Sequence, residues 1–271
     1  MKVLLTGATG LVGERLAPRL VSAGLECQAL IRQGGKVPPG VVAIQGDLFD
    51  QASLARAVEG VEAIIHLAAV FRTQDVDLIW KSNLEGAQNL IAAAQTHAGA
   101  ARFILASTSN VYDRQGVRPA RESDVVAPQQ AYPASKVAAE QALKASGLNW
   151  SIIRFPFVYG DADGHLETLP RHVEGFGFHP GHRMSTIHHR DIATAMEMAL
   201  AGAFDRRIVN IADDAPLSIY ELVELAGGAM TPSAEPTQDP WFLHVDASLA
   251  RGLGFRPEVS TVHQAARDGV L

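Results

Sequence analysis

A glycine-rich turn near the amino terminus most constrains the fold of this chain of 271 residues. An apolar run over residues 3–6 leads directly into Gly7-Ala8-Thr9-Gly10-Leu11-Val12-Gly13, which opens a helical pattern over residues 11–23. In such a strand–turn–helix, backbone N–H groups and a helix amino terminus point at a pyrophosphate, which glycine allows to come close. The sequence therefore predicts a dinucleotide site in this turn. Its expected members are Gly7, Thr9, Gly10, Leu11, Val12 and Gly13.

The first half of the chain alternates short apolar runs with longer amphipathic ones. The expected strands cover residues 3–6, 27–31, 42–45, 63–67 and 103–107, and the expected helices cover residues 11–23, 51–58 and 77–97. Strands as apolar as these are typical of parallel sheets that are covered on both faces. The alternation predicts an α/β fold with a Rossmann-type, doubly wound parallel sheet.

The second half is less regular. It predicts helices over residues 134–145, 192–200 and 219–226 and strands over residues 150–154 and 208–211, with Asp191 and Ser218 as helix N-caps. Residues 160–183 are rich in Gly, His and Pro, which indicates loops and short turns. We expect residues 1–160 to form the cofactor-binding domain and residues 161–271 to form a small carboxy-terminal substrate-binding lobe. Residues 192–211 are expected to return to the first domain.

Composition narrows the range of partners. A formal net charge of −6 is poorly suited to phosphate backbones, so nucleic acid is not an expected partner. Cys27 is the single cysteine, which excludes a disulfide within the chain and favours a reducing compartment. No apolar run approaches the roughly 18 residues of a membrane span. We therefore expect a cytoplasmic protein with a small-molecule substrate and no membrane partner; a homodimer stays open.

Several further motifs follow in a fixed order. With its Gly-x-x-Gly-x-x-Gly spacing, the chain resembles the extended branch of the short-chain dehydrogenase/reductase superfamily, which includes the NAD-dependent epimerase/dehydratase family. The motifs that carry the resemblance are Asp47-Leu48, His66-Leu67-Ala68-Ala69, Asn83, Ser107-Thr108-Ser109, Tyr132-x-x-x-Lys136 and Arg154-x-Pro156-x-Val158-Tyr159-Gly160. The resemblance implies that Asp47 and Leu48 border the adenine. The other cofactor contacts that it implies are Leu67, Ala68, Ala69, Lys136, Phe155 and Pro156.

The end of the second expected strand bears on the choice between NAD and NADP. A carboxylate there hydrogen-bonds the ribose hydroxyls of NAD and repels a 2′-phosphate. This chain has Ile31-Arg32-Gln33 and no acid at that point. Because a guanidinium can clamp a phosphate, Arg32 predicts a preference for NADP, with NAD left open. The alternative is that Arg32 is an ordinary solvated arginine.

Tyr132 and Lys136 are the expected catalytic pair. Four residues apart on a helix, both side chains project from one face, and an ammonium within reach lowers the pKa of a phenol. Tyr132 is then expected to act as the general acid/base at a carbonyl or alcohol. The resemblance implies that Thr108 orients the substrate oxygen, and that Asn83 supports Lys136 through water and backbone.

The substrate is harder to predict. We expect Phe71, Ser109, Asn110, Phe157 and Arg183 to contact a modest-sized carbonyl compound or alcohol. A nucleotide-sugar epimerase is the first alternative, disfavoured because only 27 residues separate Gly160 from His188. A cofactor-binding protein without turnover is the second alternative. Six of the ten histidines lie between His165 and His189, but their spacing does not predict a metal site.

Overall fold

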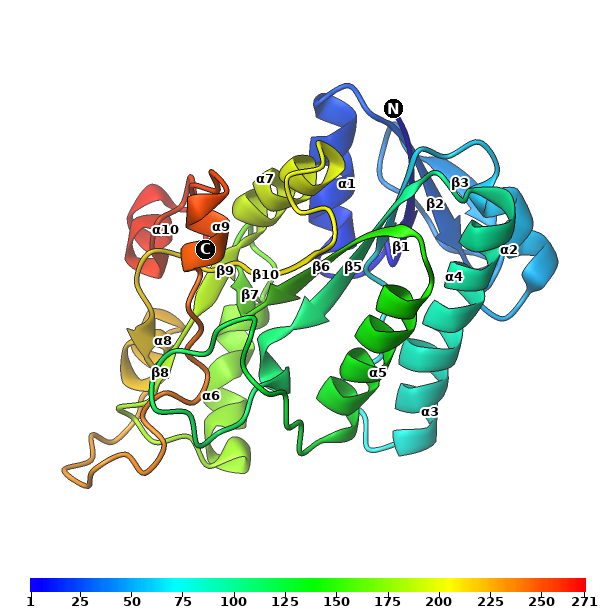
Figure 1. Cartoon of the computed structure of the whole chain (residues 1–271). Helices are drawn as coiled ribbons and strands as arrows, with labels where there is room; N and C mark the ends of the chain where they lie inside the picture. Colours follow the sequence, from blue (N-terminus) through cyan, green and yellow to red (C-terminus); the bar gives the residue numbers. More distant parts are fainter.

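The computed structural model describes residues 1–173 and 175–271, and its centre is a seven-stranded parallel sheet (Figure 1). The strand order is β3-β2-β1-β4-β5-β6-β10. The strands are β1 (Lys2–Thr6), β2 (Glu26–Ile31), β3 (Val42–Gln45), β4 (Ala63–His66), β5 (Arg102–Thr108), β6 (Asn149–Phe155) and β10 (Arg207–Asn210). The order reverses between β1 and β4, as in doubly wound folds. The predicted fold class is confirmed.

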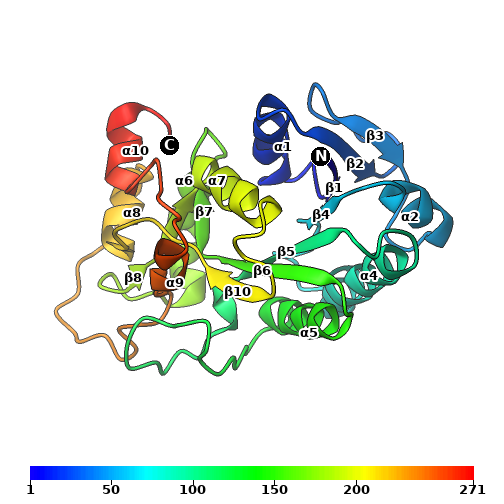
Figure 2. The ribbon, with the colours of Figure 1, turned by 45° about the horizontal axis from the view of Figure 1, so that its top comes forward.

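Two layers of helices cover the sheet, as Figure 2 shows. On one face α1 (Gly13–Ser22) packs beside α7 (His189–Leu200) over side chains such as Val3, Ile104 and Ile153. The other face carries α2 (Gln51–Val58), α4 (Gly86–His97) and α5 (Ala131–Ala145) over Leu4 and Ile64. Because both faces are buried, the strands contain few polar side chains.

The helix expected over residues 77–97 is divided into three parts. It consists of α3 (Val76–Trp80), a π-helical turn η1 (Lys81–Glu85) and α4. The side chain of Asn83 is buried within the π turn. A π turn shifts the register of a helix by one residue and often marks a functional site.

The expectation of loops over residues 160–183 is wrong for most of that segment. The helix α6 (His165–Phe176) lies there and continues through Pro170. Leu166, Leu169 and Val173 follow helical spacing and pack in one cluster with α8 (Ile219–Leu225) and α10 (Val262–Asp268). Burial of this apolar stripe outweighs the local preference of Gly, His and Pro for turns.

Smaller elements connect the lobe to the sheet. They are the parallel pair β7 (Phe157–Tyr159) and β9 (Thr186–His188), the antiparallel pair β8 (Arg183–Met184) and β11 (Leu217–Ser218), the turn η2 (Ser109–Val111) and the short helix α9 (Ser248–Gly252). Ser218 caps α8 as predicted, in a capping box with Glu221. Within the described residues, no helix has the length and apolar composition needed to cross a membrane.

The predicted cap at Asp191 is wrong. The helix α7 begins two residues earlier, and the ring of His188 accepts from the backbone N–H of Arg190 at 3.2 Å. Asp191 is buried in the first turn and accepts from the N–H groups of Glu258 and Val259 instead. Its carboxyl group therefore anchors a distant loop to the helix.

Candidate active site

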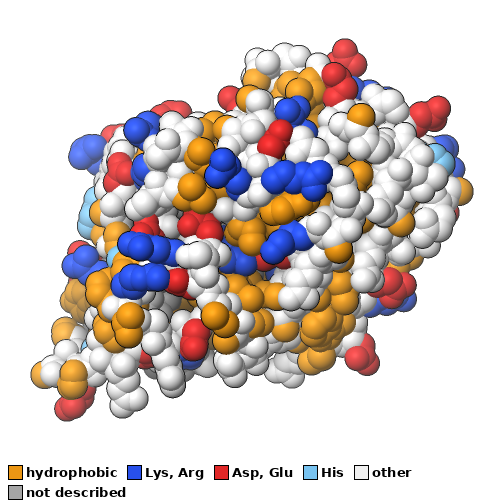
Figure 3. Space-filling view, viewed as in Figure 1, with side chains coloured by type: hydrophobic (Ala, Val, Ile, Leu, Met, Phe, Trp, Pro, Cys, Tyr) orange, Lys and Arg blue, Asp and Glu red, His pale blue; other side chains and the backbone are white. Residues whose placement is uncertain are grey.

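A cleft of about 1370 Å³ runs along the carboxyl ends of the central strands. It extends from the glycine turn after β1, past the ends of β2, β4 and β5, to the helices α5 and α6. Ligands of open α/β sheets bind at this edge, next to the point where the strand order reverses. Figure 3 shows Lys and Arg side chains around apolar side chains in the middle of one face of the molecule.

The glycine turn meets the requirements of a pyrophosphate site. Gly7 has φ +77°, and a Cβ at this residue would lie 2.6 Å from the backbone nitrogen of Ala68. A Cβ at Gly13 would lie 2.1 Å from the carbonyl oxygen of Gly7. Both glycines are therefore needed for the close packing of the turn against β4 and α1, which leaves backbone N–H groups facing the cleft. The residues present fit a dinucleotide.

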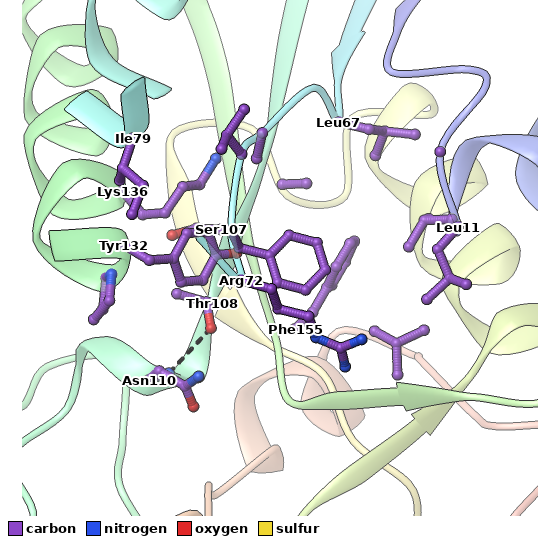
Figure 4. A pocket seen from close by; sticks show the side chains of 18 of the residues that line it. Leu11, Leu67, Arg72, Ile79, Ser107, Thr108, Asn110, Tyr132, Lys136 and Phe155 are labelled. Atoms are coloured by element: carbon purple, nitrogen blue, oxygen red, sulfur yellow. Dashed lines mark hydrogen bonds between the residues drawn. The ribbon is translucent and has the colours of Figure 1, made fainter. Parts of the chain in front are cut away.

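The other expected cofactor residues line the same cleft. Arg32 follows β2 with an exposed side chain, and Asp47 and Leu48 follow β3. In Figure 4, Leu11 and Leu67 lie at one end of the cavity and Phe155 lies nearer its middle. Every cofactor residue predicted from the sequence belongs to the lining, which comprises Gly7, Thr9, Gly10, Leu11, Val12, Gly13, Arg32, Asp47, Leu48, Leu67, Ala68, Ala69, Lys136, Phe155 and Pro156.

Tyr132 and Lys136 extend from one side of α5 toward the cavity, with Thr108 beside Tyr132 (Figure 4). Burial lowers the pKa of Lys136 to about 8, although the carboxylate of Glu140 opposes the shift. Burial raises the pKa of Tyr132 to about 12, against the hydrogen bond with Thr108. The net pKa of Tyr132 is therefore raised and not lowered as expected, because desolvation of the phenol dominates.

The end of β5 separates two neighbouring hydroxyls by strand alternation. Thr108 faces the cleft, and its Oγ1 accepts from the N–H of Asn110 at 3.2 Å. Ser107 donates instead to Glu140 Oε1 at 2.5 Å. Ser109 and Asn110 follow in η2, and both line the cleft. The structure thus brings Thr108 to Tyr132, the placement that the sequence predicted.

A buried ion pair fixes α5 to the sheet. Arg154 on β6 donates to Glu140 from Nη2 at 2.6 Å and from Nε at 3.0 Å, and both side chains are buried. Arg154 Nη1 also donates to the hydroxyl of Tyr112 at 2.9 Å. The sequence analysis missed Glu140. The signal was available, since Glu140 lies one helical turn after Lys136.

Asn83 holds the opposite side of α5. Its Oδ1 accepts from Val70 N at 2.7 Å, and its Nδ2 donates to Val70 O at 2.9 Å and to Ser135 Oγ at 3.0 Å. Ser135 Oγ in turn donates to the carbonyl oxygen of Tyr132 at 2.7 Å. Asn83 therefore positions the loop after β4 and the first turn of α5.

His66 lies at the end of β4, fully buried. Its Nδ1 is 2.6 Å from the hydroxyl of Thr6, and burial lowers the pKa of the ring to about 3, with the charge of Lys136 as a second cause. Such a neutral, buried ring is a structural part of the sheet and has no ionisable role near neutral pH.

The other end of the cleft is aromatic. The Phe71 ring lies 5.8 Å from the Tyr132 ring, and Phe157 stacks on His165 at 4.4 Å. The structure does not bring Arg183 to this site. Met184 is buried and lines the cleft, whereas Arg183, its neighbour on β8, points outward and is exposed because alternate side chains leave opposite faces of a strand. Arg72 also lines the cleft, and no sequence pattern had singled it out.

The histidines between His165 and His189 do not gather around one point. His165 Nδ1 donates to Val158 O at 2.7 Å, and His189 Nε2 lies 2.8 Å from Asp163 Oδ2. Among the described residues, no group of three or more His, Cys, Asp or Glu side chains is placed to hold a metal ion.

Comparison with known proteins agrees with this geometry. The model of the NAD dependent epimerase/dehydratase family matches residues 3–212. The chain belongs to this family. Ceramide reductase of Caulobacter vibrioides is 33% identical over 171 residues, which is 62% of this chain and 49% of that protein. UDP-glucose 4-epimerase of Corynebacterium glutamicum is 26% identical over 99% of this chain and 94% of that protein.

Solved structures of the family share the fold. A short-chain dehydrogenase/reductase superfamily protein of Agrobacterium tumefaciens with bound NAD superposes with a TM-score of 0.83 at 22% identity, over 99% of this chain and 95% of that one. Other structural neighbours also contain NAD. Relatives of the chain in this NAD-dependent enzyme family are named reductase, dehydrogenase, dehydratase and epimerase. The predicted resemblance is confirmed. The chain spans about half the length of ceramide reductase.

Proposed function

We propose that this family member is an oxidoreductase that interconverts a carbonyl compound and its alcohol, with Tyr132 as the general acid/base. One observation carries the proposal: Tyr132, Lys136 and Thr108 line the same cleft as the glycine turn. A family member that only binds the cofactor could use Lys136 for that purpose, but it would not need the hydroxyls of Tyr132 and Thr108 beside each other in the same cleft.

The pKa values of the pair favour the direction of reduction. Bound nicotinamide supplies the hydride. Tyr132, with a pKa of about 12, is protonated at neutral pH and can give its proton to the carbonyl oxygen that Thr108 orients. Lys136, with a pKa of about 8, is the stronger acid of the two, and its ammonium stabilises the phenolate that remains.

We propose NADP(H) as the preferred cofactor. Arg32 supports this, since it follows β2, lines the cleft and has no acidic neighbour at the end of that strand. Titration of both cofactors should give tighter binding of NADPH than of NADH. Arg32→Ala should remove the difference. Equal affinities in the wild type, or an unchanged preference in the variant, would contradict the assignment.

The residues that line the lobe side of the cleft support a modest-sized, largely apolar carbonyl compound as the substrate. We propose that residues 161–271 supply its binding lobe, apart from α7 and β10, which pack on or join the sheet of residues 1–160. The lobe side of the cleft is mostly aromatic and aliphatic, as is common for small-molecule pockets. Its members include Phe157, Leu169, Phe176, Phe178, Met184 and Phe242.

A nucleotide-sugar epimerase is the second candidate. The alignment with UDP-glucose 4-epimerase over 94% of that protein favours it and weakens the argument from lobe size. Oxidation of NADPH by aldehydes and ketones, measured beside epimerisation of UDP- and GDP-sugars, separates the two. Sugar turnover without carbonyl reduction would replace the proposed function by this one.

A further inference from the structure

The cleft is more positive than the chain as a whole. Although the net charge is −6, the Lys, Arg, Asp and Glu side chains in the lining, counted over residues 1–173 and 175–271, are four cations and one acid. These are Arg32, Asp47, Arg72, Arg114 and Lys136. Such a cleft attracts anionic ligands.

Three of the four cations have an assignment. Arg32 lies at the nucleoside end, and Lys136 belongs to the catalytic pair. Arg114 is neutralised by Asp239, at 3.0 Å, and lies over the Phe242 ring at 4.0 Å. Arg72 is left without an ion pair or hydrogen bond among the described residues.

Arg72 lies close to the reacting position. Its guanidinium carbon is 5.2 Å from the centre of the Phe71 ring, and that ring is 5.8 Å from the Tyr132 ring. One aromatic ring therefore separates the free cation from the proton donor. Asp163, the acid that most affects Arg72, is already occupied by the ring of His189 and the N–H of His165.

The backbone and the surroundings also distinguish Arg72. It has φ +58°, a left-handed conformation that side-chain-bearing residues rarely adopt and that gathers at functional sites. The Arg72 side chain is exposed, but desolvation of its covered part still lowers the pKa of the guanidinium, against the charge of Asp163. Burial and the charge of Arg72 lower the pKa of the nearby His165 ring. The guanidinium is therefore an exposed positive charge in the lining of the cleft, where an anionic group can reach it.

We propose that Arg72 binds an oxyanion of the substrate, so that the preferred substrate is a carbonyl compound that also carries a carboxylate or phosphate group. This inference rests on the proposed function and narrows its substrate class. The aromatic wall holds the body of the substrate, Tyr132 meets the carbonyl oxygen and Arg72 meets the anionic group. A guanidinium suits carboxylate and phosphate equally, so the source of the oxyanion is decided by experiment.

The test compares matched substrates. Oxidation of NADPH is measured with short and medium-chain oxo acids, their neutral methyl esters and oxo phosphate monoesters. A charge-assisted contact is worth about 1.5–3 kcal/mol, so KM for the preferred anion should be about tenfold or more below that of its neutral partner. Arg72→Gln should abolish this advantage by raising KM for the anion to that of its neutral ester. Arg114→Gln, the matched control in the same cleft, should retain it.

The outcomes separate this inference from the proposed function. Reduction of acids and esters with equal KM, or an advantage that survives Arg72→Gln, overturns the role of Arg72 and leaves the reductase intact. If no carbonyl compound is reduced, the proposed function fails, and thermal shifts of the NADP+-loaded protein decide the anion site. Stabilisation by the oxo or hydroxy acids in the wild type but not in Arg72→Gln supports the site, and no stabilisation overturns it.

Discussion

Replacement of Lys136 by Met should stabilise the protein while it abolishes turnover. The side chain is fully buried, and burial lowers the pKa of its ammonium from 10.5 to about 8. The folded state therefore holds the charge less well than the unfolded state does. Met preserves the length of the stem without the charge, and Glu140 keeps Arg154 and Ser107 as partners in the variant.

The pKa difference sets the size and the pH range of the effect. Each pKa unit corresponds to about 1.4 kcal/mol, so the buried ammonium destabilises the wild type by about 3 kcal/mol at neutral pH. Below pH about 8 Lys136 is charged in both the folded and the unfolded state, so the buried ammonium destabilises the folded protein to the full extent. Between pH about 8 and 10.5 only the unfolded state stays protonated, so the wild type gains stability relative to the variant as the pH rises.

Urea unfolding of nucleotide-free protein at several pH values measures this difference. At pH 7 the free energy of unfolding of Lys136→Met should exceed that of the wild type by about 3 kcal/mol, which corresponds to a midpoint roughly 6 °C higher in a thermal scan. This difference in stability should disappear toward pH 10. The control is Lys144→Met, an exposed lysine on the same helix, which should shift stability by roughly 0.5 kcal/mol or less at every pH. A variant less stable than the wild type at pH 7, or a gap independent of pH, would refute the reasoning.

Three further changes test other parts of the site. Tyr132→Phe should lower turnover by about 10²–10⁴-fold with NADPH affinity retained, and a rate above about a tenth of wild type would remove the general-acid assignment. Glu140→Ala should cost about 3–5 kcal/mol in urea unfolding because it leaves Arg154 buried without its counter-ion; a cost of about 1 kcal/mol would contradict this. Gly13→Ala should weaken NADPH binding in a fluorescence titration, since the new Cβ would lie 2.1 Å from a carbonyl oxygen. Gly252→Ala, which meets no atom within 4 Å, is its control, and equal affinities in the two variants would reject the fit argument.

Local patterns were sufficient for the cofactor half of the molecule. The turn at Gly7 and the apolar runs encode strand, turn and helix within a few residues, so their positions follow from spacing alone. The pairing of Tyr132 with Thr108 followed from the motifs and from alternation along β5. The cofactor and catalytic assignments themselves stay predictions.

The features that were missed depend on contacts between distant segments. The helix α6 forms because Leu169 and its neighbours on one face meet α8 and α10, which no local rule for Pro170 reveals. Asp191 accepts hydrogen bonds from the backbone N–H groups of Glu258 and Val259, which lie far later in the chain. The pKa of Tyr132 was misjudged because the sequence shows a lysine four residues away but not the burial that outweighs it.

The attachment of α5 has a consequence for how this architecture can diversify. The helix is held to the sheet by the ion pair of Glu140 with Arg154. It is held to η1 by the hydrogen bonds that Asn83 makes through Ser135. None of these contacts involves α6, which lines the cleft, or α8 and α10, which pack in one cluster with α6. The two parts are therefore separable by design: a chimaera that exchanges the carboxy-terminal lobe should keep Tyr132 and Lys136 in their present positions on α5.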